Sequence, residues 1–559
     1  MRVIRNTYTT EIAPIVDDLT ASSSIAQIGI MFAVRKDEAI GESNESRFLS
    51  SYREPVLAGC QNYHQGRREE MGHILYWNAV ALEANRRDFS NVPGTDKPMP
   101  EQGGPTLSSR ALAIVHLAMY DAHAGAVGGA GLPRYLSAPA SPAPGTANPE
   151  AVVATAAHAC LVALFPRQKS FFDERLASAE LSGGGVAAGK AFGIAVGQAM
   201  LADRSGDPDA DATDYVFSNT PGHHRPDPAN PGQGVHAPFY GARSKLFAVT
   251  SRHGLNAPPA IGSSEYKQAL KQVLSKGIAP ELMGTLPSTY SKRTVDETVI
   301  GLYWAYDGPR ELGTPPRLYN QIVREIAIAK GNNADKNARL FALVNAAMAD
   351  AGILAWDQKY IHDLWRPVLG IREHDPSMGP AAPTPKSDID EECDPDWLPL
   401  GAPQSNSYVP ATGRFNKNFT PPFPAYPSGH ATFGAAALHM VRLFYGVPAG
   451  DRKKDSVFKG PFVSDELNGV TQDNQGTVRP RHRRKFDDGL WQMIIENGFS
   501  RVFLGVHWSF DAFALDNNKK PNLRKDKIGG VPLGLKIAED IFVAGMGKAP
   551  KKSTVGPRT

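Results

Sequence analysis

The sequence predicts an all-α protein, built as a helix bundle with long irregular loops. Several segments repeat apolar residues three and four positions apart, the spacing that lines one face of a helix. Strand signals are sparse, since no alternating runs bounded by Asn-Gly or Asp-Gly turns stand out. Of the 559 residues, 42% are hydrophobic and 21% are charged, which is near the globular average and allows a large core. Together these observations favour a helix bundle.

The expected helices follow one another from His73 onward. The clearest begins near Asn333, and its apolar repeat runs on to Trp365 before Pro367 ends it. Residues 136–149, 203–262 and 373–422 are rich in proline, glycine or aspartate and are expected to be irregular. In chain order, we expect helices over 74–88, 107–123, 150–165, 186–203, 333–365, 431–445 and 487–504.

The two ends of the chain differ from this helical region. Residues 1–72 form a polar, charge-mixed extension without a period, and nothing in them indicates a role. Residues 546–559 contain almost no core-forming side chains, so we expect a mobile tail. The N-terminus carries acids where an export signal has its apolar region, so no standard signal peptide is visible.

Charge and cysteine content exclude several classes of protein. The 60 Lys and Arg nearly balance the 57 Asp and Glu, for a net charge of +3, which does not suggest a nucleic-acid partner. The three cysteines are scattered and build neither a disulfide framework nor a zinc site. The longest apolar runs are too short or too interrupted to span a membrane. We therefore expect a soluble protein with neither a nucleic-acid nor a membrane partner.

The segment KYIHDLWRP contains two cations seven residues apart, Lys359 and Arg366. On one helix that spacing is two turns, which places both on the same face about 10 Å apart. Two such cations can grip a small oxyanion, and the arginine offers a planar fork. Taken alone, two unrelated charges on a solvated face are the commoner explanation.

The segment PSGH, residues 427–430, immediately precedes an expected helix. Free backbone N–H groups and the helix dipole at such a position attract an anion. Ser428 adds a hydroxyl donor, Gly429 allows close backbone approach, and His430 stands where a proton carrier belongs. Simple N-capping by Ser428 beside a partly buried histidine explains the pattern equally well.

The segment SRVFLGVHWSFD combines a third cation with a second histidine. Arg501 and His507 lie about 120° apart on an uninterrupted helix, but a break at Gly505 could turn both inward. His507 and Asp511 are four apart, so the carboxylate can bind one ring nitrogen and present the other as a nucleophile or metal ligand. A core histidine satisfied by Asp511 is the alternative. Only the three segments together predict one anion site.

This ordered set resembles the signature of vanadium-dependent haloperoxidases and of the type-2 phosphatidic acid phosphatase superfamily. Its positions are Lys359, Arg366, Pro427, Ser428, Gly429, His430, Ser500, Arg501, Gly505, His507 and Asp511. Longer segments, such as ILYWNAVALEANR, HAPFYG, LYWAYDG and PPFPAYPSGHATFG, look like the fungal vanadium chloroperoxidases. The resemblance covers residues 73–545, which it makes the catalytic domain, and it implies two four-helix bundles.

The resemblance also implies a cofactor and roles for the residues. One vanadate, acting as a Lewis acid, would be bonded to His507. Its oxygens would be held by Lys359, Arg366, Ser428, Gly429 and Arg501, with Asp511 behind His507. His430 would be the acid–base residue, Lys359 would polarise the peroxide, and Asp307 would pair with Arg501. Trp356 and Phe423 match aromatic positions of the halide pocket, and bromide-preferring relatives often place histidine at the second.

The implied reaction is oxidation of chloride or bromide by hydrogen peroxide to hypohalous acid, which an unidentified organic acceptor then consumes. The principal alternative is an acid phosphatase, in which His507 attacks phosphorus and His430 protonates the leaving group. Chain length, the aromatic pair and the long matching segments favour the peroxidase. The fungal relatives imply secretion, whereas the lack of a standard signal is typical of a cytoplasmic protein, so the compartment and the oligomeric state stay open.

Overall fold

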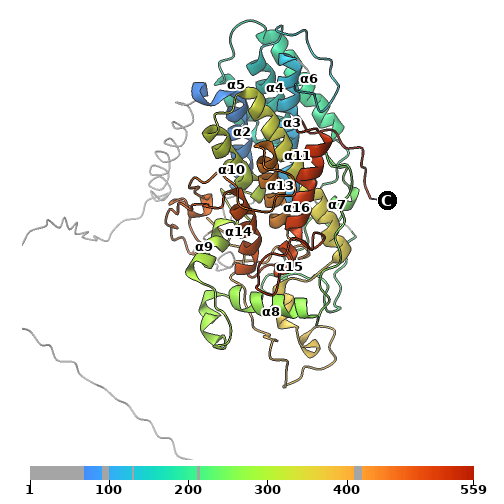
Figure 1. Ribbon diagram of the computed structural model, residues 1–559, viewed down its shortest axis with the longest axis vertical. Helices are drawn as coiled ribbons and strands as arrows, with labels where there is room; N and C mark the ends of the chain where they lie inside the picture. Colours follow the sequence, from blue (N-terminus) through green and yellow to red (C-terminus); the bar gives the residue numbers. More distant parts are fainter. Residues whose placement is uncertain (1–67, 91–99, 129–130, 210–213, 408–417, 559) are drawn as a thin grey trace, which may run out of the picture. The chain divides into compact units, whose positions relative to one another are not determined.

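The computed structural model describes residues 68–90, 100–128, 131–209, 214–407 and 418–558 (Figure 1). Most of the extension 1–72 therefore lies outside the described residues. Within them the chain is all-α, as predicted, and β-structure is limited to isolated bridges. The helices are α2 (Arg68–Asp88), α3 (Gly104–Val127), α4 (Pro149–Leu164), α5 (Lys169–Ala177), α6 (Val186–Asp203), α7 (Tyr240–Arg243), α8 (Ser264–Lys276), α9 (Val295–Tyr303), α10 (Pro315–Ala329), α11 (Ala334–His362), α12 (Pro367–Arg372), α13 (Gly429–Phe444), α14 (Leu490–Phe503), α15 (Ser509–Ala512) and α16 (Gly530–Ala544).

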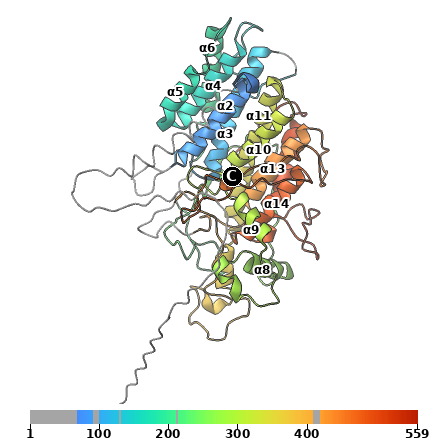
Figure 2. The same cartoon turned by 90° about the vertical axis from the view of Figure 1, so that its left-hand side faces the viewer.

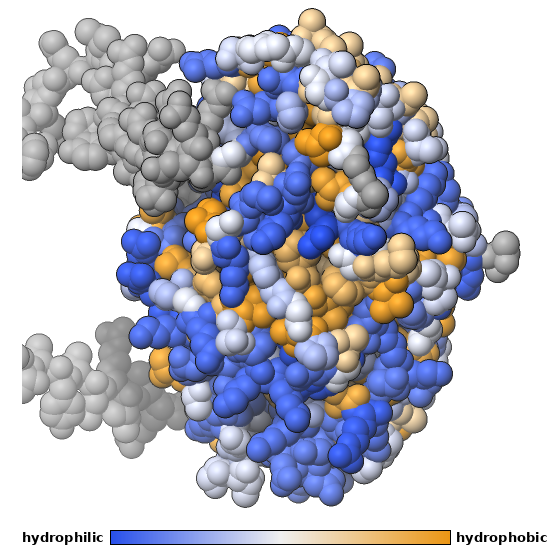
Figure 3. All heavy atoms as spheres, turned by 45° about the horizontal axis from the view of Figure 1, so that its top comes forward, coloured by the Kyte–Doolittle hydropathy of each residue, from blue (hydrophilic) through white to orange (hydrophobic). Residues whose placement is uncertain are grey.

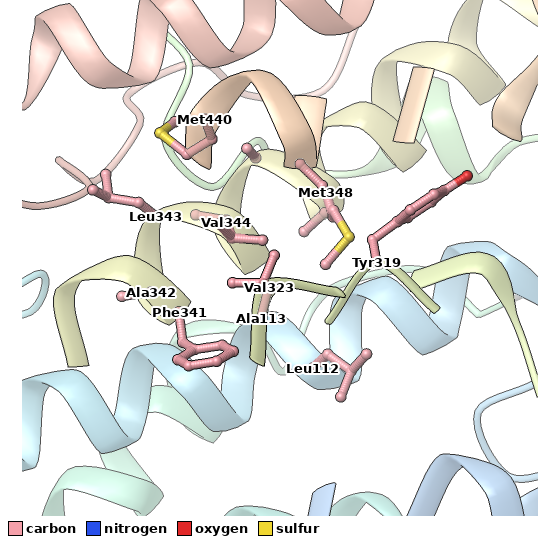
Figure 4. Close-up of a cluster of buried hydrophobic side chains, with 14 of the residues drawn as sticks. Leu112, Ala113, Tyr319, Val323, Phe341, Ala342, Leu343, Val344, Met348 and Met440 are labelled. Atoms are coloured by element: carbon pink, nitrogen blue, oxygen red, sulfur yellow. The ribbon is translucent and has the colours of Figure 1, made fainter. Parts of the chain in front are cut away.

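Helix α11 runs through the core and touches helices from both halves of the sequence. It begins where Asn333 accepts a hydrogen bond from the backbone N–H of Lys336, a standard N-cap. Its apolar side chains pack against α3, α10 and α13 (Figure 4). Among the described helices it alone has the length and composition of a membrane span, and 94% of its apolar window is buried inside the protein. Its hydrophobicity is explained by this core position.

Two groups of helices pack around α11. Helices α2 to α6 lie together at one end, whereas α13 and α16 pack against α11 and α14 packs against α13 (Figures 1 and 2). In α16, a Cβ at Gly534 would lie 2.4 Å from the carbonyl oxygen of Thr432 in α13, so only glycine allows this close crossing. The division into two four-helix bundles stays a prediction. Hydrophilic residues cover most of the face in Figure 3, and apolar residues gather near its centre.

The helix predicted over 333–365 ends three residues early, at His362. Asp363 adopts the left-handed conformation, with φ 46°, and its carboxylate is held by the Tyr215 hydroxyl at 2.6 Å and the His223 ring at 2.9 Å. Arg366 instead precedes the new helix α12, which starts at Pro367. Lys359 and Arg366 therefore do not share a helix face, and that part of the sequence argument was wrong.

The C-terminal tail, expected to be mobile, is hydrogen-bonded along its course. The backbone of Ser553 donates to Phe247, and Val555 accepts from Leu246. Near the end, Nε of Arg558 donates to the buried carboxylate of Asp357 in α11 at 2.9 Å. In this tail, backbone groups and ion pairs to Asp203 and Asp357 provide contacts in place of buried apolar side chains. Its mobility stays a prediction.

Candidate active site

The three predicted segments meet around one cavity of about 240 Å³. Helix α11 brings Lys359, the start of α13 brings Ser428 to His430, and α14 with the turn after it brings Arg501 and His507. Lys359, Arg366 and Ser428 are buried behind the wall, at 0–1% exposure. The side chains and backbone that line the cavity include Asp307, Gly429, His430, Arg501, His507, Trp356 and Phe423.

His507 presents one nitrogen as an acceptor, because its partners fix where the ring proton lies. Nη1 of Arg366 lies 2.9 Å from Nε2 of His507 and can only donate. The proton therefore sits on Nδ1, which donates to Asp511 Oδ2 at 2.7 Å. Burial, followed by the charge of Arg366, holds the pKa of His507 well below its usual value. A neutral ring with a lone pair on Nε2 is the form that ligates a metal.

Two arginines of this site carry buried donors that have no partner among the described residues. Arg366 donates Nε to the carbonyl of Phe423 and Nη1 to that of Val506, both at 2.8 Å, while Nη2 is buried without a partner among the described residues. Arg501 binds Asp307 through both Nη atoms, at 2.9 and 2.7 Å, and its buried Nε has no partner in the described part of the chain. Buried unpaired donors are costly, so these N–H groups mark a place for an acceptor.

Lys359 is held differently from the arginines. Its Nζ donates to the carbonyls of Pro424, Ala425 and Pro427 at 2.8, 3.1 and 2.6 Å, which uses all three ammonium protons. Burial and the charge of Arg366 hold the pKa of this lysine well below its usual value. In this structure it therefore fixes the 424–427 turn and supplies charge without a donor directed at the cavity.

His430 stands at the start of α13, beside the ion pair of Arg501. Ser428 caps this helix by accepting from the N–H of Ala431 at 3.3 Å. Nε2 of His430 lies 2.6 Å from the carbonyl of Ala305 and so carries the proton, which leaves Nδ1 as the basic nitrogen. The Asp307 carboxylate is 3.9 Å away. Burial, with Arg501 as a secondary cause, lowers the pKa of His430 to about 4.

The aromatic side of the cavity contains one residue that the sequence argument missed. The rings of Trp356 and Phe423 lie 4.8 Å apart, as that argument expects. His236 packs against both, with ring centroids 5.9 and 6.2 Å away. The motif HAPFYG had pointed to this stretch, but nothing in the sequence separated its histidine from a structural one. The carbonyls of Ala305 and Val506 were also missed, because backbone groups leave no residue-type signal.

Comparison with known proteins places this site in a family. The model of the vanadium chloroperoxidase N-terminal domain matches residues 68–245, and that of the family's second helical-bundle domain matches residues 339–515. The vanadium chloroperoxidase of Curvularia inaequalis is 35% identical, over 86% of this chain and 90% of its own. The chain therefore belongs to the vanadium chloroperoxidase family and is a vanadate-dependent haloperoxidase.

Two solved structures share the fold at lower identity. A bacterial vanadium-dependent chloroperoxidase is 15% identical, with a TM-score of 0.53 over 83% of this chain and 96% of its own. A bacterial vanadium-dependent iodoperoxidase is 18% identical, with a TM-score of 0.51 over 86% and 97%. One is named for iodide and the other for chloride, so this fold alone does not determine which halide is oxidised.

The residues present fit vanadate. Nη2 of Arg366 and Nε of Arg501 are buried donors without acceptors among the described residues, and His507 offers a lone pair beside Arg366. Burial raises the pKa of Asp511 to about 7, which weakens the negative charge opposing the cations. A tetrahedral oxyanion would satisfy the donors and the charge together.

Proposed function

We propose that this cavity oxidises chloride and bromide with hydrogen peroxide, and releases hypohalous acid to an organic acceptor. The observation that carries the proposal is a cluster of buried groups at one cavity. Nε of Arg501 and Nη2 of Arg366 have no partner among the described residues, and Nε2 of His507 keeps a lone pair that only Arg366 contacts. We further propose that 73–545 is the catalytic unit with one vanadate, and that neither nucleic acid nor a membrane takes part.

His507 would hold the metal through Nε2, while Arg366, Arg501, Ser428 and the N–H of Gly429 would hold the oxygens. When bound, vanadate supplies a Lewis acid that stays in its highest oxidation state. Asp511 keeps the proton of His507 on Nδ1 and fixes the ring plane. Lys359 contributes its positive charge from behind the wall, at 5.1 Å from the Phe423 ring.

His430 takes the proton that hydrogen peroxide must lose. Its Nε2–H is committed to Ala305, so Nδ1 is the nitrogen that accepts. The low pKa keeps the ring neutral at mildly acidic pH, where an acceptor is needed. Asp307 neutralises part of the positive charge of Arg501 and holds its guanidinium in a fixed orientation.

Trp356 and Phe423 make the part of the cavity where the halide is oxidised relatively dry. Low local polarity strengthens every charge interaction in it. The guanidinium carbon of Arg366 lies 4.9 Å from the centre of the Phe423 ring, so the apolar wall directly adjoins the cations. Chloride is harder to oxidise than bromide and depends most on this arrangement.

The test is a steady-state assay of chloride and bromide oxidation by purified protein, with vanadate removed and then restored. Halide oxidation should depend on vanadate for both ions. Equal activity after exhaustive chelation would contradict the proposal. Hydrolysis of a phosphate ester by the vanadate-free protein, without halide oxidation by the loaded protein, would favour the phosphatase instead.

A further inference from the structure

His236 lies in the active-site cavity, although it comes from the irregular segment before α7. It lines the same cavity as His430 and His507. Its ring stands edge-on to Trp356, at an interplanar angle of 89°, and is tilted by 56° to Phe423. The aromatic wall is therefore a set of three rings, one of which carries nitrogen.

Hydrogen bonds fix the position of His236 from several directions. Its backbone N–H donates to the carbonyl of Pro422 at 2.8 Å. Its carbonyl accepts from the Trp356 indole at 3.3 Å and from the Tyr360 hydroxyl at 2.6 Å. Gly104 adjoins the ring so closely that a Cβ there would lie 2.4 Å from Nε2. Such a group is preorganised, and packing alone would not require so many polar anchors.

One ring nitrogen of His236 is used by the protein and the other is left available. Nε2 lies 3.0 Å from the hydroxyl of Thr106, in the first turn of α3. Nδ1 makes no hydrogen bond to any residue in the described part of the chain. A hydroxyl can donate to Nε2, and the ring then carries its proton on Nδ1, where it can donate to an anion.

We propose that His236 is a specificity-determining residue of the halide pocket, donating from Nδ1 to the chloride or bromide ion that the reaction consumes. The halide is the reactant that needs both an apolar surround and a single donor, and this wall offers both. Two solved structures share the fold although their names refer to different halides, so the fold alone does not set the halide. The inference rests on the proposed haloperoxidase function.

The test compares three substitutions that separate the two nitrogens. In His236→Gln the side-chain amide nitrogen can occupy the position of Nε2. In His236→Asn it can occupy the position of Nδ1. His236→Phe keeps an aromatic ring and removes both nitrogens. The Michaelis constants for bromide and chloride are measured at saturating vanadate and peroxide. Independently, crystals of the vanadate-free proteins are soaked in bromide, and its anomalous scattering locates the ion.

In the Phe and Gln variants we expect the bromide KM to rise about tenfold, the effect of one hydrogen bond to an anion. The kcat of these two variants should change less than about threefold, a smaller change in free energy than that in KM. The bromide KM of the Asn variant should stay near that of the wild type. A bromide peak beside Nδ1 should disappear in the Phe variant. If the Asn variant bound bromide weakly while the Gln variant bound it as the wild type does, only the contact with Thr106 would matter. That result would overturn the proposal. Unchanged KM values in all three would also overturn it.

A wild type that oxidises no halide would instead refute the haloperoxidase function. The bromide soak separates that failure from failure of the inference, because it needs neither vanadate nor turnover. His158→Gln, which alters a histidine on α4 paired with Asp173, is the control for histidine replacement outside the cavity. It should change neither KM nor the bromide peak.

Discussion

Nη1 of Arg366 lies 2.9 Å from Nε2 of His507, the nitrogen that would bond to vanadium. A guanidinium cannot share that lone pair with a metal. If His507 holds vanadate through Nε2, this N–H of Arg366 would have to leave the ring and would become available as a donor to the oxyanion. The same contact fixes the tautomer beforehand, so the histidine needs no proton rearrangement when vanadate enters.

The two histidines should fail in different ways when removed. His507→Ala should lower vanadate affinity more than about 100-fold, because it removes the proposed ligand itself and not only an outer partner. His430→Ala should keep vanadate and lose roughly 10²–10⁴-fold in kcat, the usual contribution of proton transfer. Vanadate titration and steady-state kinetics on both variants check this, and equal loss of affinity would refute the separate roles.

Asp511→Asn should weaken vanadate binding by about 10–100-fold, the typical effect of losing a partner behind a metal ligand. The amide can turn its NH₂ toward Nδ1 of His507, which favours the tautomer whose Nε2 has no lone pair. Calorimetric titration with vanadate measures the change. Asp357→Asn is the matched control. Asp357 is likewise a buried carboxylate, but it pairs with two arginines and contacts none of the residues proposed to hold vanadate. Equal losses in both would point to general destabilisation.

Phosphate should compete with vanadate for the site. Both are tetrahedral oxyanions of similar charge, and the unpaired donors of Arg366 and Arg501 do not distinguish them. The apparent dissociation constant for vanadate should rise in proportion to added phosphate, while maximal halide oxidation is restored by excess vanadate. Phosphate inhibition that no amount of vanadate reverses would contradict a shared site.

Phe423→His should lower chloride turnover more than bromide turnover. A second imidazole beside His236 adds a polar, titratable group and hydrates the wall on which the harder oxidation depends. The chloride-to-bromide rate ratio, measured at mildly acidic pH in wild type and variant, is the quantity to compare. We expect chloride oxidation in the wild type, with bromide faster. If the ratio does not move, this aromatic position does not set halide preference.

The rate should fall on the acid side as His430 becomes protonated. Burial lowers its pKa to about 4 in the vanadate-free protein. A bound oxyanion adds negative charge, which favours the protonated ring and moves the pKa upward. The acid limb of kcat/KM for peroxide should therefore lie above pH 4, with activity lost as the pH decreases through it. In His430→Gln the residual activity should lack this limb, and its persistence would assign it to another group.

The sequence predicted α2, α3, α4, α6, α11, α13 and α14, but it missed several other helices, among them α8, α10 and α16. Periodicity located α11 and α13 because apolar stripes depend on local spacing. It misplaced the end of α11, because Asp363 is held in its left-handed conformation by Tyr215 and His223, which lie about 140 residues earlier. Such distant contacts leave no local pattern.

The sequence predicted which residues belong to the candidate site, but it did not predict how they are arranged in space. Gly505 does break the chain after α14, with φ 74°, as the spacing of Arg501 and His507 required. His507 and Asp511 do pair, although His507 precedes α15 and is not inside a helix. The three carbonyls around Lys359 were not predictable, since any residue type provides one.

Helix α11 contributes both to the centre of the core and, through Trp356 and Lys359, to the reaction chamber. Selection for a folded protein and selection for halide chemistry therefore act on the same 29 residues. A library aimed at new halide preferences would lose most of its members to misfolding if it were built on this helix. Diversity is better placed in the irregular segments that contribute Phe423 and His236, which lie outside this central helix.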